Sequence, residues 1–340
     1  MAIRNAGIFA LIAVVVIVPL ALAGGALYYM TAMPGHSYQG PLPPLTAQER
    51  ELAVRLRAHV TAIASAEHNV AHYQKLEEAA THIETLLRGY GCLVRRQEFD
   101  SKAGSVRNLE ITVPCSSPTQ QRRRLVVIGA HYDSAKGAPG ANDNASGVAA
   151  LLELAGLLED MKTAVDREVR LVFFVNEEAP YLKTTQMGSW VHASELKAQG
   201  RDVVAMVSLE TIGYYSDAAG SQHYPFPFAL IYPDKGNFLG FVSTLDSRTL
   251  VRRAIASFRE HASFPSEGVA APGFVPGVDW SDHWSYSEHG YPAVMITDTA
   301  LYRYPHYHTA DDSPDKIDYE RLARVVKGVE SLIRELAAKS

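Results

Sequence analysis

Apolar residues recur at helical spacing near the start of the chain. Leu52, Leu56, Val60 and Ile63 follow one another at intervals of three or four positions, which predicts one buried helix face. A capping-box pattern at residues 46–49 marks the start of this helix. A second helix is expected to follow and to end at a pair of nearby glycines. The chain therefore enters its folded part through two helices.

Short apolar runs further along the chain predict the strands of a sheet. Strands are expected at 92–99, 106–115, 125–130, 169–175, 203–209, 228–232 and 293–297. Helical patterns at 146–158, 246–261 and 318–336 lie between and after them. Continuous apolar runs indicate strands that are buried on both faces, and their alternation with helices indicates parallel pairing. We predict an α/β fold: a three-layer α/β/α sandwich with a central mixed, mostly parallel sheet.

The N-terminal segment is apolar and uncharged from residue 6 to residue 29, and Arg4 precedes it. About 20 apolar residues suffice to cross a bilayer as a helix. We therefore predict a membrane anchor at residues 1–30, with the rest of the chain outside the cytoplasm because the positive charge precedes the apolar run. The alternative is a cleaved signal peptide with the protein secreted, since Ala21-Leu22-Ala23 resembles a cleavage site.

A stretch rich in Pro and Gly follows this segment and predicts a linker at residues 31–45. One catalytic domain is expected at 46–340. Of the 340 residues, 47% are hydrophobic and 20% are charged, which is typical of a packed core and excludes a disordered protein. The net charge of -5 provides no basic surface, so nucleic acid is not an expected partner.

The two cysteines bound the first two predicted strands. If residues 100–105 form a hairpin turn, Cys92 and Cys115 face each other across the pair of strands. A disulfide between them fits an oxidising compartment and hence an exported domain. Two buried free thiols are the alternative.

Residues that bind metals follow several of the predicted strands. They are His131, Glu177 with Glu178, Glu210 and His308, while Asp143 lies in a polar loop just before a helix. The carboxyl ends of parallel strands share one edge of a sheet, so these side chains are expected to converge. Taken singly, each has an ordinary role as a hydrogen-bonded histidine, a solvated carboxylate or a helix cap. Together they favour a buried cation, because clustered buried carboxylates need compensation. Mixed imidazole and carboxylate ligands suit zinc.

Three motifs carry a resemblance to a known family. They are Gly129-Ala-His-Tyr-Asp-Ser134 with the loop at 140–147, Phe173-Phe-Val-Asn-Glu-Glu178, and Tyr307-His308 with Asp312 shortly after. In this order they resemble the zinc aminopeptidases of the co-catalytic di-zinc exopeptidase clan, which includes bacterial leucine aminopeptidases. Glutaminyl cyclases and the protease-like domain of transferrin receptor are more distant relatives. The resemblance spans residues 69–333.

The resemblance implies a site for two zinc ions. His131 and Glu210 would bind the first ion, Glu178 and His308 the second, and Asp143 would bridge the two. The position of Glu210 is usually Asp in these aminopeptidases, so this chain carries one additional methylene there. Such a site is still expected to hold two ions, and weak binding of the first ion is the alternative.

The resemblance also implies roles for three further residues. Glu177 would be the general base, Asp133 would orient a ligand imidazole, and Tyr307 resembles the tyrosine that stabilises the oxyanion in some members. A zinc-dependent exopeptidase is implied, with aminopeptidase action on peptide substrates the favoured reading. The aromatic-rich segments at 213–241 and 302–307 either line a pocket for an apolar side chain or pack ordinarily.

Two other functions share this fold. One is a glutaminyl-cyclase-like acyltransferase that uses a single zinc, and the other is a non-catalytic, receptor-like binding domain. The chain has no Gly-x-Ser-x-Gly elbow, which disfavours a serine hydrolase. It also has no His-Glu-x-x-His sequence, which excludes the thermolysin-type zinc site.

Overall fold

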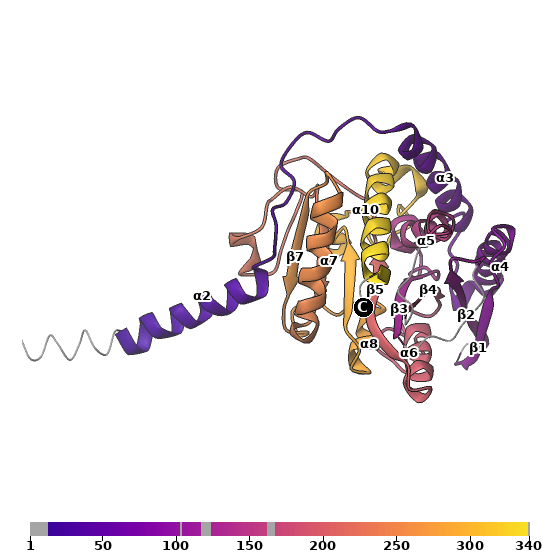
Figure 1. Cartoon of the computed structure of the whole chain (residues 1–340), viewed down its shortest axis with the longest axis horizontal. Helices are drawn as coiled ribbons and strands as arrows, with labels where there is room; N and C mark the ends of the chain where they lie inside the picture. The colour runs from indigo at the N-terminus through magenta and orange to yellow at the C-terminus, as the bar shows by residue number, and fades with distance from the viewer. Residues whose placement is uncertain (1–12, 103, 117–123, 162–166, 339–340) are drawn as a thin grey trace, which may run out of the picture.

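A computed structural model describes residues 13–102, 104–116, 124–161 and 167–338 (Figure 1). Its strands are β1 Arg95–Ser101, β2 Gly104–Val113, β3 Arg124–His131, β4 Arg167–Phe174, β5 Asp202–Glu210, β6 Leu239–Ser243, β7 Ser266–Ala270 and β8 Ala293–Thr297. Its α-helices are α2 Val18–Thr31, α3 Ala47–Ile63, α4 Tyr73–Gly89, α5 Ser146–Leu157, α6 Gly188–Ala198, α7 Arg248–His261, α8 His283–Glu288, α9 Ala300–Arg303 and α10 Tyr319–Ala338. Short helical turns are η1 Ala13–Ile17, η2 Val70–His72, η3 Ala141–Ala145, η4 Phe228–Leu230, η5 Leu245–Ser247 and η6 Pro314–Lys316.

The strands form one eight-stranded mixed sheet in the order β1-β2-β4-β3-β5-β8-β6-β7. The central neighbours β4, β3, β5 and β8 run parallel, as do β6 and β7. The pairs β1–β2, β2–β4 and β6–β8 are antiparallel. The predicted mixed, mostly parallel sheet is confirmed. Its parallel centre brings the carboxyl ends of β3, β4 and β5 together.

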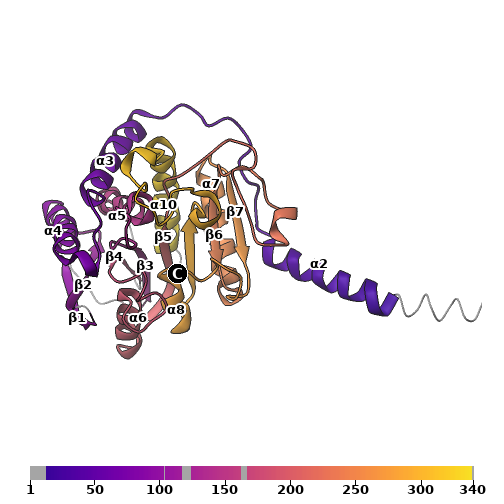
Figure 2. The ribbon, with the colours of Figure 1, turned by 180° about the vertical axis from the view of Figure 1, so that it is seen from behind.

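Helices cover both faces of the sheet (Figures 1 and 2). Alternate residues of β3 point to opposite faces of the sheet. On one face, Val126 and Ile128 belong to the main core, which also includes residues of α3, α4, α5, α7 and α10. Leu125 and Val127 face the other side and pack with residues of α6 and with Tyr286 of α8. Burial on both faces explains the continuous apolar runs in the sequence. The α/β assignment is confirmed, with helices flanking one sheet.

Most of the predicted elements form within a few residues of their expected bounds. Thr46 and Glu49 make the reciprocal hydrogen bonds of a capping box at the start of α3. The hairpin β1–β2 forms, and Cys92 and Cys115 are joined by a disulfide just beyond its paired residues. One strand prediction is wrong: the run at 228–232 contains the 3-10 turn η4. A short apolar run does not by itself distinguish a strand from a turn packed over a cavity.

The N-terminal segment forms α2, which extends away from the sheet (Figure 1). In the described part of the chain, no helix has the length and apolar character needed to span a membrane. The predicted spanning helix is therefore unsupported, and its residues 1–12 lie outside the described residues. The segment between α2 and α3 has no regular structure, and it contacts the domain. Side chains of Arg252 and Arg259 on α7 donate hydrogen bonds to the carbonyls of Ala32 and Pro34.

Candidate metal centre

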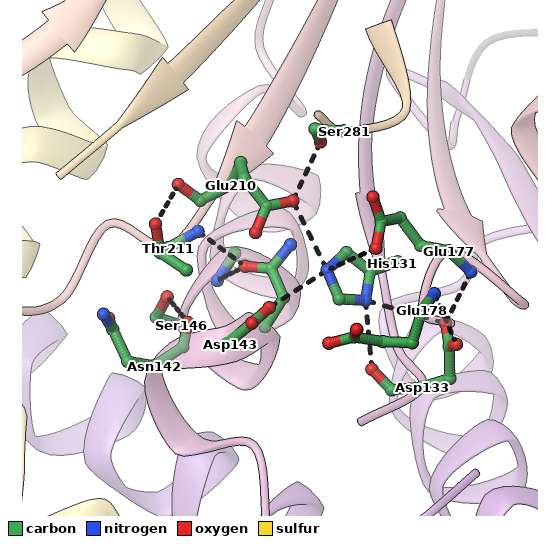
Figure 3. Close-up of polar contacts among 12 residues, drawn as sticks. His131, Asp133, Asn142, Asp143, Ser146, Glu177, Glu178, Glu210, Thr211 and Ser281 are labelled. Carbon is green, nitrogen blue, oxygen red and sulfur yellow. Dashed lines mark hydrogen bonds and ion pairs between the residues drawn. The ribbon is translucent and has the colours of Figure 1, made fainter. Parts of the chain in front are cut away.

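Three neighbouring strands place carboxylates and an imidazole at one edge of the sheet (Figure 3). His131 is the last residue of β3, and Glu210 is the last residue of β5, the strand beside it. Glu177 and Glu178 follow β4 on the other side of β3. All four residues are buried. The parallel centre of the sheet therefore gathers side chains that lie up to 79 positions apart.

Asp143 enters the site from the irregular turn η3 ahead of α5. The carboxylate of Asp312 fixes this turn by accepting hydrogen bonds from the backbone N–H groups of Asn142, at 2.8 Å, and Asp143, at 3.2 Å. The side chain of Asn144 ties the turn to the end of β5, because it donates to the carbonyl of Leu209 at 2.8 Å. The peptide bond that links Asp143 to Asn144 is cis. These contacts hold the Asp143 carboxylate between the other donors.

His131 is the centre of one group of donors. Its Nε2 lies 3.2 Å from Asp143 Oδ1 and 3.3 Å from Glu210 Oε2, and 3.9 Å from Glu177 Oε2. Its other nitrogen, Nδ1, lies 3.0 Å from the backbone carbonyl of Asp133. That carbonyl can only accept, so Nδ1 carries the proton and Nε2 directs a lone pair at the carboxylates.

His308 completes a second group from the loop beyond α9. Its Nε2 lies 2.9 Å from Asp143 Oδ2 and 3.4 Å from Glu178 Oε1. The ring of Tyr307 stacks on this imidazole with centroids 3.9 Å apart. His308 itself adopts a left-handed backbone conformation, with φ at 56°. Non-glycine residues rarely take this conformation, and histidine is among those that take it more often.

Asp133 has a different geometry from the predicted one. Its carboxylate oxygen lies 3.6 Å from Nδ1 of His131, so the imidazole contacts mainly the backbone carbonyl. The two carboxylate oxygens instead accept the backbone N–H groups of Glu177 and Glu178, each at 3.2 Å. Asp133 thereby positions the glutamate pair as well as the histidine.

Ser281 contacts the site, although the sequence analysis gave it no role. Its hydroxyl donates to Glu210 Oε2 at 2.8 Å and lies 2.9 Å from the hydroxyl of Ser208. Ser281 precedes α8, 71 positions after Glu210, so only the fold brings the two together. The additional methylene of Glu210 still leaves its carboxylate at contact distance from His131. The hydroxyl of Ser281 holds the longer side chain in place.

The described donors fit a pair of zinc ions. Three groups of donors have ligand atoms within 4.8 Å of one another: His131 with Glu177 and Glu178, His131 with Asp143 and Glu210, and Asp143 with Glu178 and His308. Asp143 belongs to the last two groups, as a ligand shared by two ions would. Nε2 of His131, Oδ1 of Asp143 and Oε1 of Glu178 are buried without a hydrogen-bond partner among the described residues. A cation bound among these buried atoms would compensate them.

The pKa shifts of the site also favour a bound cation. Burial and the neighbouring Asp143 raise the pKa of Glu178 to about 7. Burial raises the pKa of Glu177 well above its usual value, and the neighbouring His131 offsets only part of this shift. Burial lowers the pKa of His308, but the facing carboxylates of Asp143 and Glu178 outweigh this effect and raise the pKa to about 10. The cluster thus favours bound positive charge, which a metal ion supplies.

An apolar cavity opens beside the donors, with Glu210 and Tyr307 in its lining. Its empty volume is about 890 Å³, part of it open to solvent. The loop at 222–232, the ends of β6 and β7, and the segment at 275–280 form its walls. The aromatic segments singled out in the sequence therefore do line a cavity, and this cavity adjoins the metal centre.

The profile of Peptidase family M28 matches residues 112–333. The chain belongs to peptidase family M28. The predicted relationship to zinc aminopeptidases is thus confirmed, and membership in M28 implies zinc and identifies a peptidase-type hydrolase. The three sequence motifs and all five predicted ligands lie within the matched residues.

Several curated proteins are similar to this M28 chain. The uncharacterized protein YfbL of Escherichia coli K12 is 40% identical over 270 residues, which cover 76% of this chain and 80% of YfbL. A probable leucine aminopeptidase 1 of Trichophyton verrucosum is 27% identical over 240 residues, or 66% of this chain. The present chain spans only 57% of that fungal relative.

Solved structures share the M28 fold at lower identity. The LapA aminopeptidase of Legionella pneumophila superposes with a TM-score of 0.67 at 19% identity, covering 88% of this chain and 78% of LapA. A zinc aminopeptidase of Bacillus subtilis gives 0.53 at 24% identity, covering 70% and 52%. A glutaminyl cyclase of Fimbriiglobus ruber gives 0.61 at 19% identity, covering 87% and 97%. These likenesses establish the fold, which both activities use.

Proposed function

We propose that this M28 chain is a zinc-dependent aminopeptidase that releases N-terminal residues from peptides. The observation that carries the proposal is the pair of donor groups sharing Asp143. A shared carboxylate fixes two cations at a short separation, as two-metal hydrolases require. Similarity to leucine aminopeptidases supports the same reading.

The ligand assignment is part of this proposal. His131 and Glu210 would hold one zinc, Glu178 and His308 would hold the other, and Asp143 would contribute to both. When bound, the zinc ions supply an acidified water and polarise the carbonyl of the scissile amide. The chain's own residues fix the geometry of this chemistry. Asp133 keeps the proton of His131 on Nδ1, and Ser281 restrains the carboxylate of Glu210.

Glu177 is the general base of the proposed reaction. It is buried at the rim of both donor groups, and Asp133 fixes its backbone. Its carboxylate takes the proton from the attacking water and passes it to the leaving amine. A raised pKa suits a group that must both accept and release a proton near neutral pH. Tyr307 stacks beside His308 and lines the cavity, where it can stabilise the developing oxyanion.

Cleavage at the N-terminus of a peptide substrate is supported by the carboxylates of the site and by the shape of the adjoining cavity. The carboxylate of Glu210 lines the cavity, where it can accept a hydrogen bond from the free α-amino group of a peptide. The adjoining cavity then receives the first side chain.

Metal removal and substrate choice test this function together. Chelation should abolish hydrolysis of leucyl p-nitroanilide and of a Leu-initiated peptide, and added zinc should restore it. The same peptide with an acetylated N-terminus should stay intact. Cleavage of the acetylated peptide would contradict the aminopeptidase assignment. Ring closure of a Gln-initiated peptide without leucine release would support the cyclase instead.

We also propose that the domain works outside the cytoplasm. The Cys92–Cys115 bridge supports this location, because structural disulfides persist in oxidising compartments.

A further inference from the structure

One row of residues crosses the sheet beneath the cavity. Glu210 pairs with Thr297 of β8, Thr297 pairs with Gly240 of β6, and Gly240 pairs with Glu267 of β7. All four line the cavity. Directly paired residues project from the same face of a sheet. The cavity therefore extends along this row from a proposed zinc ligand at one end to a second carboxylate at the other.

The carboxylate of Glu267 is poorly compensated. Its side chain is 22% exposed, and burial raises its pKa, which Arg259 and Ser37 only partly offset. The ion pair with Arg259 is long, at 3.7 Å. The guanidinium instead donates shorter hydrogen bonds to the backbone carbonyls of Ser266, at 2.6 Å, and Pro34, at 2.9 Å. Glu267 keeps the capacity to accept a further donor from the cavity.

The walls of the cavity suit the stem of a long side chain. Tyr224, Phe228 and Tyr232 line it and pack on one another, with ring centroids 5.6 Å and 6.2 Å apart. The phenol groups of Tyr224 and Tyr232 donate to the backbone carbonyls of Pro233 and Gly268. Aromatic faces bury methylene groups and also attract a cation.

We propose that Glu267 is a specificity-determining residue, and that the cavity selects peptides that begin with lysine or arginine. The inference rests on the proposed aminopeptidase function and names its substrate class. The α-ammonium group and the scissile bond lie at the Glu210 end, the aliphatic stem lies along the aromatic walls, and the terminal cation meets Glu267.

The dimensions of the row agree with this placement. Neighbouring strands are about 4.8 Å apart, so about 14 Å separates β5 from β7. A lysine side chain of five bonds, each about 1.5 Å, reaches about 6 Å when extended. With a charged hydrogen bond of about 2.8 Å, it spans about two strand spacings. A substrate α-carbon above β8 therefore places its ammonium group at Glu267, whereas a leucine side chain ends two bonds earlier.

The central test compares lysine with norleucine, which has the same four-carbon stem and no charge. We expect the zinc-loaded wild-type protein to cleave lysyl p-nitroanilide at least tenfold more efficiently than norleucyl p-nitroanilide, as kcat/KM. Glu267→Gln should reduce this ratio to about one or below, while the values for norleucine and leucine stay within threefold. Exposed Glu260 on α7 provides the matched control, and Glu260→Gln should leave every ratio unchanged.

The outcomes separate this inference from the function on which it rests. If norleucine equals or exceeds lysine in the wild-type protein, or if Glu267→Gln weakens both substrates equally, Glu267 does not set specificity. Leucine release would then still support an aminopeptidase. If the zinc-loaded protein cleaves no unblocked substrate, the proposed function itself fails. The wild-type ratio decides the substrate class even where the variant does not fold.

Discussion

Glu177 is the residue whose replacement tests the chemistry most directly. Glutamine keeps its shape but cannot accept a proton, so Glu177→Gln should lower kcat for leucyl p-nitroanilide by about 10²- to 10⁴-fold. Its carboxylate is not needed in either three-donor group that shares Asp143. The zinc content per chain should therefore stay unchanged by metal analysis.

The control for this change is Glu288→Gln, at an exposed position on α8. It should match the wild-type protein in both rate and zinc content. Full activity of Glu177→Gln would rule out the assignment of the base, whereas lost zinc would show that Glu177 is a ligand.

Ser281 tests how the chain holds Glu210. Ser281→Ala removes the hydroxyl that donates to Glu210 Oε2 and leaves the four other donors untouched. Residues that orient a metal ligand typically contribute 10- to 100-fold to metal affinity. We expect a weakening of zinc binding of about this size, measured by competition with a chromogenic chelator.

Ser331→Ala on α10 is a suitable control, because the hydroxyl of Ser331 donates to the carbonyl of Lys327 in its own helix. Equal zinc affinity in Ser281→Ala and the wild-type protein would mean that Glu210 needs no restraint.

These residues show how far sequence reasoning reaches at a site. His131 and Glu210 end apolar strands, and that position alone predicts their convergence. Ser281 follows no such strand, and its contact depends on how the segment before α8 crosses β5. The bond from His131 to the carbonyl of Asp133, rather than to the carboxylate, likewise depends on backbone geometry that the sequence does not reveal.

At the scale of elements, Glu110 of β2 links three parts of the structure. Its carboxylate lies 2.6 Å from Nε2 of His192 on α6, 3.2 Å from Arg170 on β4 and 3.3 Å from Arg95 on β1. Burial alone would raise its pKa, but His192 and the two arginines lower it to about 2. A depressed carboxyl pKa stabilises the fold above the unfolded value of 4.5, and this contribution disappears as the pH falls toward 2.

Glu110→Gln should therefore destabilise the protein most at neutral pH. The difference in unfolding free energy from the wild-type protein should shrink by about 3 kcal/mol between pH 4.5 and pH 2. Urea denaturation at several pH values measures it. Exposed Glu98 on β1 serves as the control, and Glu98→Gln should differ little from the wild-type protein at any pH. A difference independent of pH would show that packing, rather than charge, accounts for the effect of Glu110.

The sequence predicts strands most accurately where both faces of the strand are buried. β3, β4, β5 and β8 are buried on both faces, and their apolar runs predict them to within two residues. β6 and β7 were missed, because a glycine interrupts each strand and Glu267 breaks the apolar pattern. Two of the residues that interrupt these apolar patterns, Gly240 and Glu267, line the cavity.

At the scale of the whole molecule, the disulfide and the cavity lie at opposite edges of the sheet. The disulfide lies by the β1–β2 hairpin at one edge, and the cavity lies over β6 and β7 at the other. Between them, β3, β4 and β5 lead into three of the five proposed ligands, namely His131, Glu178 and Glu210. A change at the hairpin should therefore alter stability without altering the rate of the folded enzyme.

The double variant Cys92→Ala, Cys115→Ala tests this separation. The bridge joins residues 23 positions apart, and closing a loop of that length stabilises a protein by about 3 kcal/mol through the unfolded chain. Urea denaturation should show a loss of that size. At temperatures where both proteins are folded, kcat for leucyl p-nitroanilide should agree within twofold. Reductant should produce the same loss in the wild-type protein and none in the variant. If the unfolding free energies agree without reductant, the bridge is absent in solution, and the disulfide no longer supports a location outside the cytoplasm.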